Sequence, residues 1–310
     1  MREQMFRALA AGILVPAAMW GQIGNIVVTN AASFRVGVPQ PGSIGTVFCT
    51  GLSVNGIVSA TGAPLPFSLA GVTVSIGGAP APLFAVADLG GYQQVNFQVP
   101  LEAQFTAGYY SEVSGSTQVV VSQNGVQGSA TVPVDTTTPG EFFRLGSTQY
   151  GVFQHVDYSL VTEESPALPG EIIIAYLTGL QTATPAVPTG QPAPADPLSV
   201  ECDRTPTLSV NRHNLQLGPT SIYDPYNVDP GCIASYTQIS GPITYIGLSP
   251  TSVGLFQINF TVPASAPAGD QPLILVWRRC WRFPGGITVC NPSDQLSSQP
   301  VLLPVGLGTH

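Results

Sequence analysis

A nine-residue pattern that occurs twice constrains this chain more than any other feature. The pattern reads YQQVNFQVP at Tyr92–Pro100 and LFQINFTVP at Leu255–Pro263. In both copies apolar and polar side chains alternate, which is the period of a β-strand with one buried face. Each copy ends at a proline, which lacks the N–H group that a further ladder hydrogen bond would need. The chain is therefore expected to contain two copies of one β-unit.

A second pair of matching segments supports the duplication and sets its register. The segment PGSIGTVFCTGL at Pro41–Leu52 aligns without a gap on PGEIIIAYLTGL at Pro169–Leu180. The chain has 34 glycines and 30 prolines, and only 8% of its residues are charged, so amphipathic helices are not expected. We predict an all-β fold of two Greek-key β-sandwiches with about seven strands each.

The polar residues of the repeated strand have two interpretations. Gln94 and Asn96 in the first copy occupy the same positions as Gln257 and Asn259 in the second. Amide side chains beside turns usually form hydrogen bonds with neighbouring backbone, which is the simpler interpretation. The alternative is a polar patch that takes part in recognition.

The chain divides into a leader and two units. Met1–Gly21 has the pattern of a signal peptide, because two arginines precede an apolar run, Ala8–Met19, that is too short to span a bilayer. We therefore expect a secreted or extracytoplasmic protein whose mature chain has no transmembrane segment. The boundaries that we assign are a first sandwich at 22–135 and a second at 136–310, the latter with an insert at 201–236 and a hairpin at 277–290.

Charged and titratable residues exclude several classes of function. The nine basic residues are all arginine, so chemistry that depends on a lysine is absent. A net charge of −8 argues against nucleic acid as a partner. The histidines, His155, His213 and His310, lie far apart and accompany no catalytic motif. We expect no enzyme and no cofactor, although a triad assembled only in the fold stays open.

Two segments of the second unit are expected to be loops. Pro185–Pro197 holds five prolines without periodicity, which predicts an exposed loop. The insert carries Asp224, Asn227 and Asp229, whose oxygen atoms are of the type that binds calcium. Their spacing lacks the EF-hand pattern, so we expect these residues to form turns.

The five cysteines fall into two groups. Cys49 aligns with Leu177 of the second unit at an apolar strand position, which predicts a buried free thiol. The other four lie in the second unit: Cys202, Cys232, Cys280 and Cys290. The last two are symmetric about Gly285 in a Pro-Gly-Gly turn, which predicts a disulfide across a hairpin and leaves the first two to close the insert. Zinc binding is the weaker alternative, because no C-x-x-C spacing is present.

That hairpin is the candidate ligand surface. Its segment WRRCWRFPGGITVC places two tryptophans and three arginines within six residues. On a strand Trp277, Arg279 and Trp281 share one face, so a guanidinium can lie against an indole, and Arg282 lies on the other face. The tryptophans either pack the end of the sandwich or form an aromatic and guanidinium surface for a sugar or an anionic polymer.

Taken together, these motifs resemble a known family. The residues that carry the resemblance are NAASF, PGSIGTVFCTGL, SLAGVTVSIGGAPAPLFAV, QVNFQVP and TPGEFF in the first half, then PGEIIIAYLTGL, ITYIGLSP and LFQINFTVP. Their order is similar to that of the Solibacter-type C-terminal domain of secreted acidobacterial proteins. The resemblance implies two tandem immunoglobulin-like β-sandwiches in an exported protein. The insert and the Trp/Arg hairpin are additional to the usual pattern.

Two classes of function follow from these observations. Duplication, export and the absence of catalytic motifs favour a non-catalytic module in adhesion or in the cell envelope, with a protein or a glycan of the cell surface as partner. The alternative is a carbohydrate-binding sandwich that uses the Trp/Arg hairpin.

Overall fold

The computed structural model describes residues 22–106, 115–135, 140–180, 183–201, 209–218, 220–223, 243–282 and 288–307. The described residues form strands, turns and loops and contain no helix, so the prediction of an all-β fold is confirmed. In these residues there is accordingly no helical segment able to cross a bilayer. Several predictions fall outside the described residues: the signal peptide at 1–21, Cys202 and Cys232, and the three residues considered for calcium, Asp224, Asn227 and Asp229.

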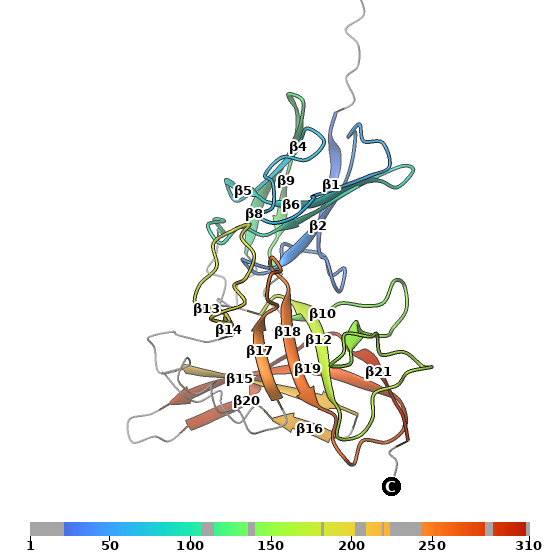
Figure 1. The fold of residues 1–310 in the computed structure, drawn as a ribbon. Helices are drawn as coiled ribbons and strands as arrows, with labels where there is room; N and C mark the ends of the chain where they lie inside the picture. Colours follow the sequence, from blue (N-terminus) through green and yellow to red (C-terminus); the bar gives the residue numbers. More distant parts are fainter. Residues whose placement is uncertain are drawn as a thin grey trace, which may run out of the picture.

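The N-terminal unit, the upper one in Figure 1, is made of two antiparallel sheets. One sheet has the strand order β1-β2-β7-β6-β3 and the other has the order β5-β4-β8-β9. The strands are β1 (Gly24–Asn30), β2 (Ile44–Thr50), β3 (Ile57–Ser59), β4 (Val72–Ile76), β5 (Ala79–Ala81), β6 (Leu83–Asp88), β7 (Gln93–Gln98), β8 (Ser116–Gln123) and β9 (Val126–Pro133).

The C-terminal unit repeats this arrangement, and the strands of its second sheet are longer than their counterparts. Its first sheet has the order β10-β12-β18-β17-β14-β13, with β11 also paired to β12; its second has the order β16-β15-β19-β20, with β21 also paired to β19. The strands are β10 (Glu141–Phe142), β11 (Phe153–Gln154), β12 (Ile172–Thr178), β13 (Ala183–Thr184), β14 (Val200–Glu201), β15 (Ser209–Leu217), β16 (Thr220–Tyr223), β17 (Ile243–Leu248), β18 (Phe256–Thr261), β19 (Gly269–Arg282), β20 (Thr288–Ser297) and β21 (Val301–Val305).

The two repeated sequence patterns are neighbouring strands in each unit. Strand β2 pairs with β7 so that Ile44 lies opposite Gln98, and β12 pairs with β18 so that Ile172 lies opposite Thr261. These pairs are equivalent in the sequence alignment, so both units have the same register. The orders β1-β2-β7-β6 with β4-β8-β9, and β10-β12-β18-β17 with β15-β19-β20, are the ABED and CFG sheets of an immunoglobulin sandwich. The chain is a tandem immunoglobulin-like β-sandwich protein.

Each unit has its own hydrophobic core between its two sheets. Val47, Val95 and Phe97 are fully buried in the first, and Ile258 and Phe260 are fully buried in the second. They occupy the apolar positions of the repeated strands, as the alternation predicts. The two clusters share no residue, so each sheet pair encloses a separate core.

The prediction of a buried free thiol at Cys49 is confirmed. The side chain is 1% exposed in the first core and forms no disulfide. Burial raises the pKa of the thiol to about 11, because the thiolate would lose its hydration. Cys49 is therefore protonated and unreactive in the folded protein.

The two units meet in a hydrogen-bonded junction. The Ile44 amide at the start of β2 donates to Thr178 Oγ1 at the end of β12, 2.7 Å away. Gln98, 6% exposed, accepts a hydrogen bond from the Gly190 amide at 2.7 Å and donates to the Gly42 carbonyl at 3.3 Å. Each unit thus donates a backbone N–H to a side chain of the other unit, which connects the two sandwiches.

The proline-rich segment is a loop whose residues are mostly exposed or half-buried, as predicted, but it also takes part in this junction, and Gly190 and Ala193 are buried. The Gly190 carbonyl accepts a hydrogen bond from the Leu65 amide of the first unit at 2.9 Å, and Ala193 is 3% exposed. Both backbone groups of Gly190 thus find hydrogen-bond partners in the first unit, Leu65 and Gln98. Sequence composition carries no information about such a distant partner.

Candidate ligand-binding site

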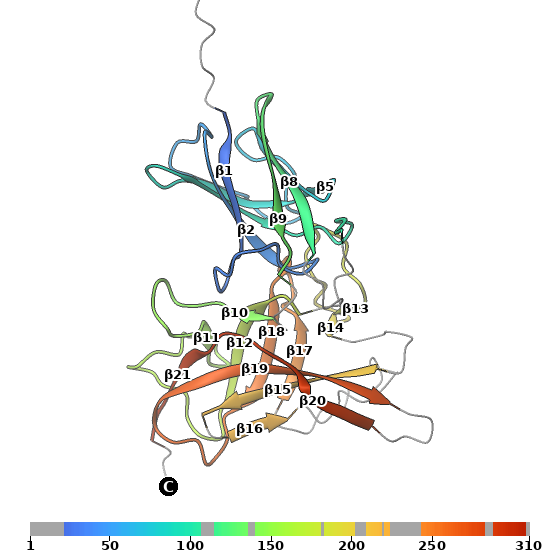
Figure 2. The same cartoon turned by 180° about the vertical axis from the view of Figure 1, so that it is seen from behind.

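The residues of the Trp/Arg hairpin lie on β19, which has a partner on each side. Trp277 pairs with His213 of β15, and Trp281 pairs with Ser209 of β15 and Val289 of β20. This end of β19 extends past the facing sheet, whose strands cross it at a wide angle (Figure 1, Figure 2). The backbone of Trp277, Arg279, Trp281 and Arg282 therefore belongs to the central strand of a ribbon, while their side chains lie outside the described residues.

The predicted insert also contributes to this ribbon. Strand β15 lies within 201–236 and pairs with β19 from Ser209 to Leu217. Leu217 is fully buried, so part of the range belongs to the sandwich and its core. An isolated two-stranded hairpin is marginally stable, and the third strand removes that weakness.

The cysteine pairing remains a prediction, which the backbone register supports in part. Cys280 of β19 lies directly opposite Cys290 of β20, the position from which a cross-strand bridge forms. We expect peptide mapping of the secreted protein without reduction to recover Cys280 joined to Cys290 and Cys202 joined to Cys232. Recovery of Cys49 in a bridged peptide would contradict this pairing.

A serine, a histidine and a glutamate come together in the second unit in the arrangement of a hydrolase triad. His155 Nδ1 lies 2.6 Å from Glu171 Oε1, and His155 Nε2 lies 3.3 Å from Ser165 Oγ. The Ser165 carbonyl oxygen is also 3.2 Å from Nε2. Both ring nitrogens therefore face acceptors, which favours the doubly protonated imidazolium.

The surroundings of His155 favour its charged form. Burial acts to lower the pKa of His155, but the hydrogen bonds to Glu171 and to the Ser165 carbonyl outweigh it, and the net pKa is raised. A general base must accept the serine proton at a free nitrogen. This cluster joins the Ser165 turn to Glu171 through His155. Within the described ranges no three metal-ligating side chains gather.

An exposed aromatic cluster lies on the outer face of the β1-β2-β7-β6-β3 sheet. We use this name for Phe34, Phe48 and Tyr92. The ring centroid of Phe48 lies 6.4 Å from that of Phe34 and 5.8 Å from that of Tyr92. The Phe48 and Tyr92 rings meet edge to face. Phe34 is 57% and Tyr92 47% exposed. Three rings in contact therefore line a surface open to solvent.

The conformation of Phe34 is unfavourable for its residue type. Its φ is 58°, in the left-handed region, where a bulky side chain is an outlier that costs about 1–3 kcal/mol. The buried Asn30 holds this turn, because its side-chain oxygen accepts hydrogen bonds from the amides of Ala32 and Ser33 and its carbonyl accepts one from Phe34. The fold thus holds an exposed aromatic ring in a strained position.

The amides of the repeated strand lie beside the aromatic cluster. Gln94 is directly opposite Phe48 in the β2–β7 pair and donates to Asn96 Oδ1 at 2.8 Å. Thr46 also donates to that oxygen, at 3.0 Å. These amides thus bond to each other and to a neighbouring strand instead of capping loop backbone. The face combines apolar rings with amide and hydroxyl groups.

Sequence patterns indicate only part of this site. Phe48 occupies a position of β2 whose neighbours Val47 and Cys49 point into the core, so the alternation alone places an aromatic residue outside. The contribution of Phe34 has no periodic signal, since it comes from a turn between β1 and β2.

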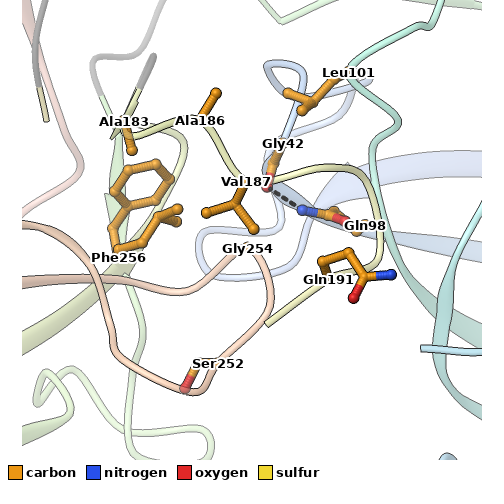
Figure 3. Close-up of a pocket in the computed structure, with 11 residues that line it drawn as sticks. Gly42, Gln98, Leu101, Ala183, Ala186, Val187, Gln191, Ser252, Gly254 and Phe256 are labelled. Carbon is orange, nitrogen blue, oxygen red and sulfur yellow. Dashed lines mark hydrogen bonds between the residues drawn. The ribbon is translucent and has the colours of Figure 1, made fainter. Parts of the chain in front are cut away.

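An apolar cavity lies between the two units (Figure 3). Its volume is about 130 Å³, and its apolar walls include Leu101, Val187 and Phe256. Gln98 reaches this wall, but its amide is bonded to Gly42 and Gly190. The space is well below that of common small-molecule sites, which occupy about 300–1,000 Å³.

Comparison with known proteins adds little to this description. Neither protein-family models nor curated protein sequences gave a match. Among solved structures, tandem immunoglobulin domains of titin are 8% identical, covering 92% of this chain and 96% of theirs, with a TM-score of 0.18. The C-terminal domain of the AgI/II polypeptide BspA of Streptococcus agalactiae is 10% identical, covering 92% and 99%, with a TM-score of 0.17.

A third structure is an endo-fucoidan hydrolase of glycoside hydrolase family 107. It is 10% identical, with a TM-score of 0.16, and the alignment covers 77% of this chain but 24% of the hydrolase. Scores this low do not establish a shared structure. The assignment to the immunoglobulin-like class therefore depends on the strand order and register of the chain itself.

Proposed function

We propose that the chain is an exported, non-catalytic interaction module that acts in adhesion or in the cell envelope, and that it binds its partner through the aromatic cluster. Phe34 is the observation that carries this proposal. An exposed phenyl ring gains little from burial, and its backbone conformation costs stability. Strain of this kind gathers at functional sites, where binding compensates for it.

The junction supports the same function. A module that presents a surface to a partner binds better when its parts are already ordered, because less conformational entropy is lost. The hydrogen bonds from the Gly190 amide to Gln98 and from the Ile44 amide to Thr178 join the second unit to the sandwich that carries the cluster. The second unit thus acts as a rigid support.

Replacing Phe34 by asparagine tests the proposal. Asparagine tolerates the left-handed conformation, so Phe34→Asn removes the ring without disturbing the turn. We expect surface retention of the secreted protein on its own cells, measured by fractionation, to fall at least about tenfold, since an aromatic anchor in an interface often contributes 2 kcal/mol or more. The free energy of unfolding should stay the same or rise by about 1 kcal/mol.

The matched control is Phe67→Asn, another exposed phenylalanine of the first unit, 45% exposed. It should leave retention unchanged. Equal retention of wild type and Phe34→Asn, with both folded, would show that the aromatic cluster is not the binding surface.

A carbohydrate-binding role of the Trp/Arg hairpin is the second candidate. The observation that favours it is the pairing of β19 with both β15 and β20, which makes the ribbon rigid at the place where Trp277, Arg279 and Trp281 lie. Loss of glycan binding in Trp281→Ala combined with Arg279→Ala, at unchanged thermal stability, would support this candidate over the first.

A further inference from the structure

The strained aromatic residue of the first unit has a counterpart in the second. Tyr158 lies in the turn between β11 and β12, four residues before Thr162, the residue that aligns with Phe34. Its φ is 67° and its side chain is 69% exposed. The Tyr158 amide donates to the His155 carbonyl three residues earlier, which closes the turn. Both units therefore hold an exposed aromatic ring in a left-handed conformation before the second strand of the sandwich.

The partner of this ring is duplicated as well. Tyr176 aligns with Phe48, because β2 and β12 match without a gap. The Gln154 side chain joins the two tyrosines, since it accepts from the Tyr176 hydroxyl at 2.6 Å and donates to the Tyr158 carbonyl at 2.8 Å. Burial and, to a lesser degree, the nearby Tyr158 hydroxyl raise the pKa of Tyr176. We call Tyr158 and Tyr176 the second aromatic pair.

The amides beside the rings are the third duplicated element. Gln257 lies directly opposite Tyr176 in the β12–β18 pair, as Gln94 lies opposite Phe48 in the first unit. Its Nε2 donates to Asn259 Oδ1 at 2.8 Å, the same distance as between Gln94 and Asn96. One ring and the amide pair thus recur at aligned positions, and each unit adds a second exposed ring from the loop before that strand.

The junction brings the strands that carry Phe48 and Tyr176 end to end. The start of β2 meets the end of β12 at the hydrogen bond from Ile44 to Thr178. Phe48 is four residues from Ile44, and Tyr176 is two residues from Thr178. At about 3.3 Å per residue, the two sites are less than about 30 Å apart.

We propose that the two aromatic sites together bind a neutral polysaccharide, one stretch of the chain at each site. Two equivalent sites on a rigid support suit a ligand that itself repeats. Aromatic rings stack on the C–H faces of sugars, and the adjoining amides form hydrogen bonds with hydroxyl groups. The exposed residues of the first site carry no charge, and the net charge of −8 disfavours anionic polymers. This inference rests on the proposed function and names its partner.

The test measures binding of the full secreted chain to soluble neutral polysaccharides, namely dextran, laminarin, galactomannan and arabinoxylan, with alginate as the anionic comparison. The variants are Phe34→Asn, Tyr158→Asn and the double substitution, with Phe67→Asn as control. We expect saturable binding to one of the neutral polymers and none to alginate. Each single variant should weaken it about 100-fold, because linked sites gain about 10²–10⁴ from effective concentration, and the double variant should abolish it.

The outcomes separate this inference from the proposed function. Saturable neutral-polysaccharide binding that Tyr158→Asn leaves within about twofold of wild type would overturn the bivalent arrangement. If no neutral polymer binds, while retention on cells still depends on Phe34, the partner is of another class and only the further inference fails. Equal binding by wild type and the folded double variant would overturn both the site and its ligand.

Discussion

Replacing Phe97 by alanine is expected to lower the free energy of unfolding of the first sandwich by about 3–5 kcal/mol. The ring is fully buried between the sheets. A Cβ atom at Gly45 would lie only 2.7 Å from the ring, so the phenyl ring of β7 occupies the space that a side chain on β2 would need. Removing the ring leaves a cavity that Gly45, lacking a side chain, cannot fill. Urea unfolding followed by circular dichroism measures the loss.

The control for this variant is Gln94→Ala on the opposite face of the same strand. Gln94 is half-buried and bonded mainly to Asn96, so its loss should cost less than about 1 kcal/mol. A cost below about 1 kcal/mol for Phe97→Ala would mean that β7 does not face the core as described.

The second large effect is a loss of stability as the pH rises, which we attribute to Glu141. This residue begins the second sandwich, is 1% exposed, and accepts a hydrogen bond from the Gln299 amide at 2.9 Å. Burial raises the pKa of its carboxyl group to about 7; the Gln299 bond and Arg35 oppose that shift without cancelling it. The folded protein therefore keeps a proton that the unfolded chain loses at a lower pH.

The sign of the effect follows from this difference. Stability due to Glu141 is fully present below the unfolded pKa of about 4.5 and is lost as the pH rises through about 7. At about 1.4 kcal/mol per pKa unit, we expect a loss of about 3 kcal/mol between pH 4.5 and pH 8.5. Chemical denaturation across this range measures it.

Glu141→Gln isolates the contribution of this carboxyl group. The amide keeps an acceptor for Gln299 and does not titrate, so the variant should match the wild type near pH 4.5 and exceed its stability by about 3 kcal/mol at pH 8.5. The pKa of His155 is also raised, so its contribution to the free energy of unfolding is likewise lost as the pH rises. That loss is the same in the wild type and in Glu141→Gln. Parallel pH profiles for the two proteins would contradict the assignment to Glu141.

The order of residues along the chain was enough to predict which side chains of a strand face the core. The alternation in the repeated strands identifies Val95 and Phe97 as core residues, and the alignment of Cys49 with Leu177 places the thiol in the core. The match of the two segments also predicts that both units share one register, as the β2–β7 and β12–β18 pairs do. Each inference depends on neighbours along the chain, because the period of two decides which face a side chain occupies.

The candidate site could be predicted only in part. The sequence indicates an aromatic residue at Phe48 on the outer face and amides at Gln94 and Asn96, but not the ring of Phe34 beside them. The candidate ligand surface at Trp277 and Trp281 was predicted from local composition, which identifies unusual segments but does not show what packs against them. Strand β15, inside the supposed insert, supports that ribbon through pairs between residues about 70 positions apart.

The sequence by itself thus determined the all-β class, the duplication and the faces of the central strands, because these follow from the two-residue period and from chain breakers. Only the tertiary structure decided the contacts between distant segments. It brings Gly190 to Gln98, sets both ring nitrogens of His155 against acceptors, and joins the start of β2 to the end of β12. The physical reason is that such contacts depend on how whole sheets pack, which no local pattern encodes.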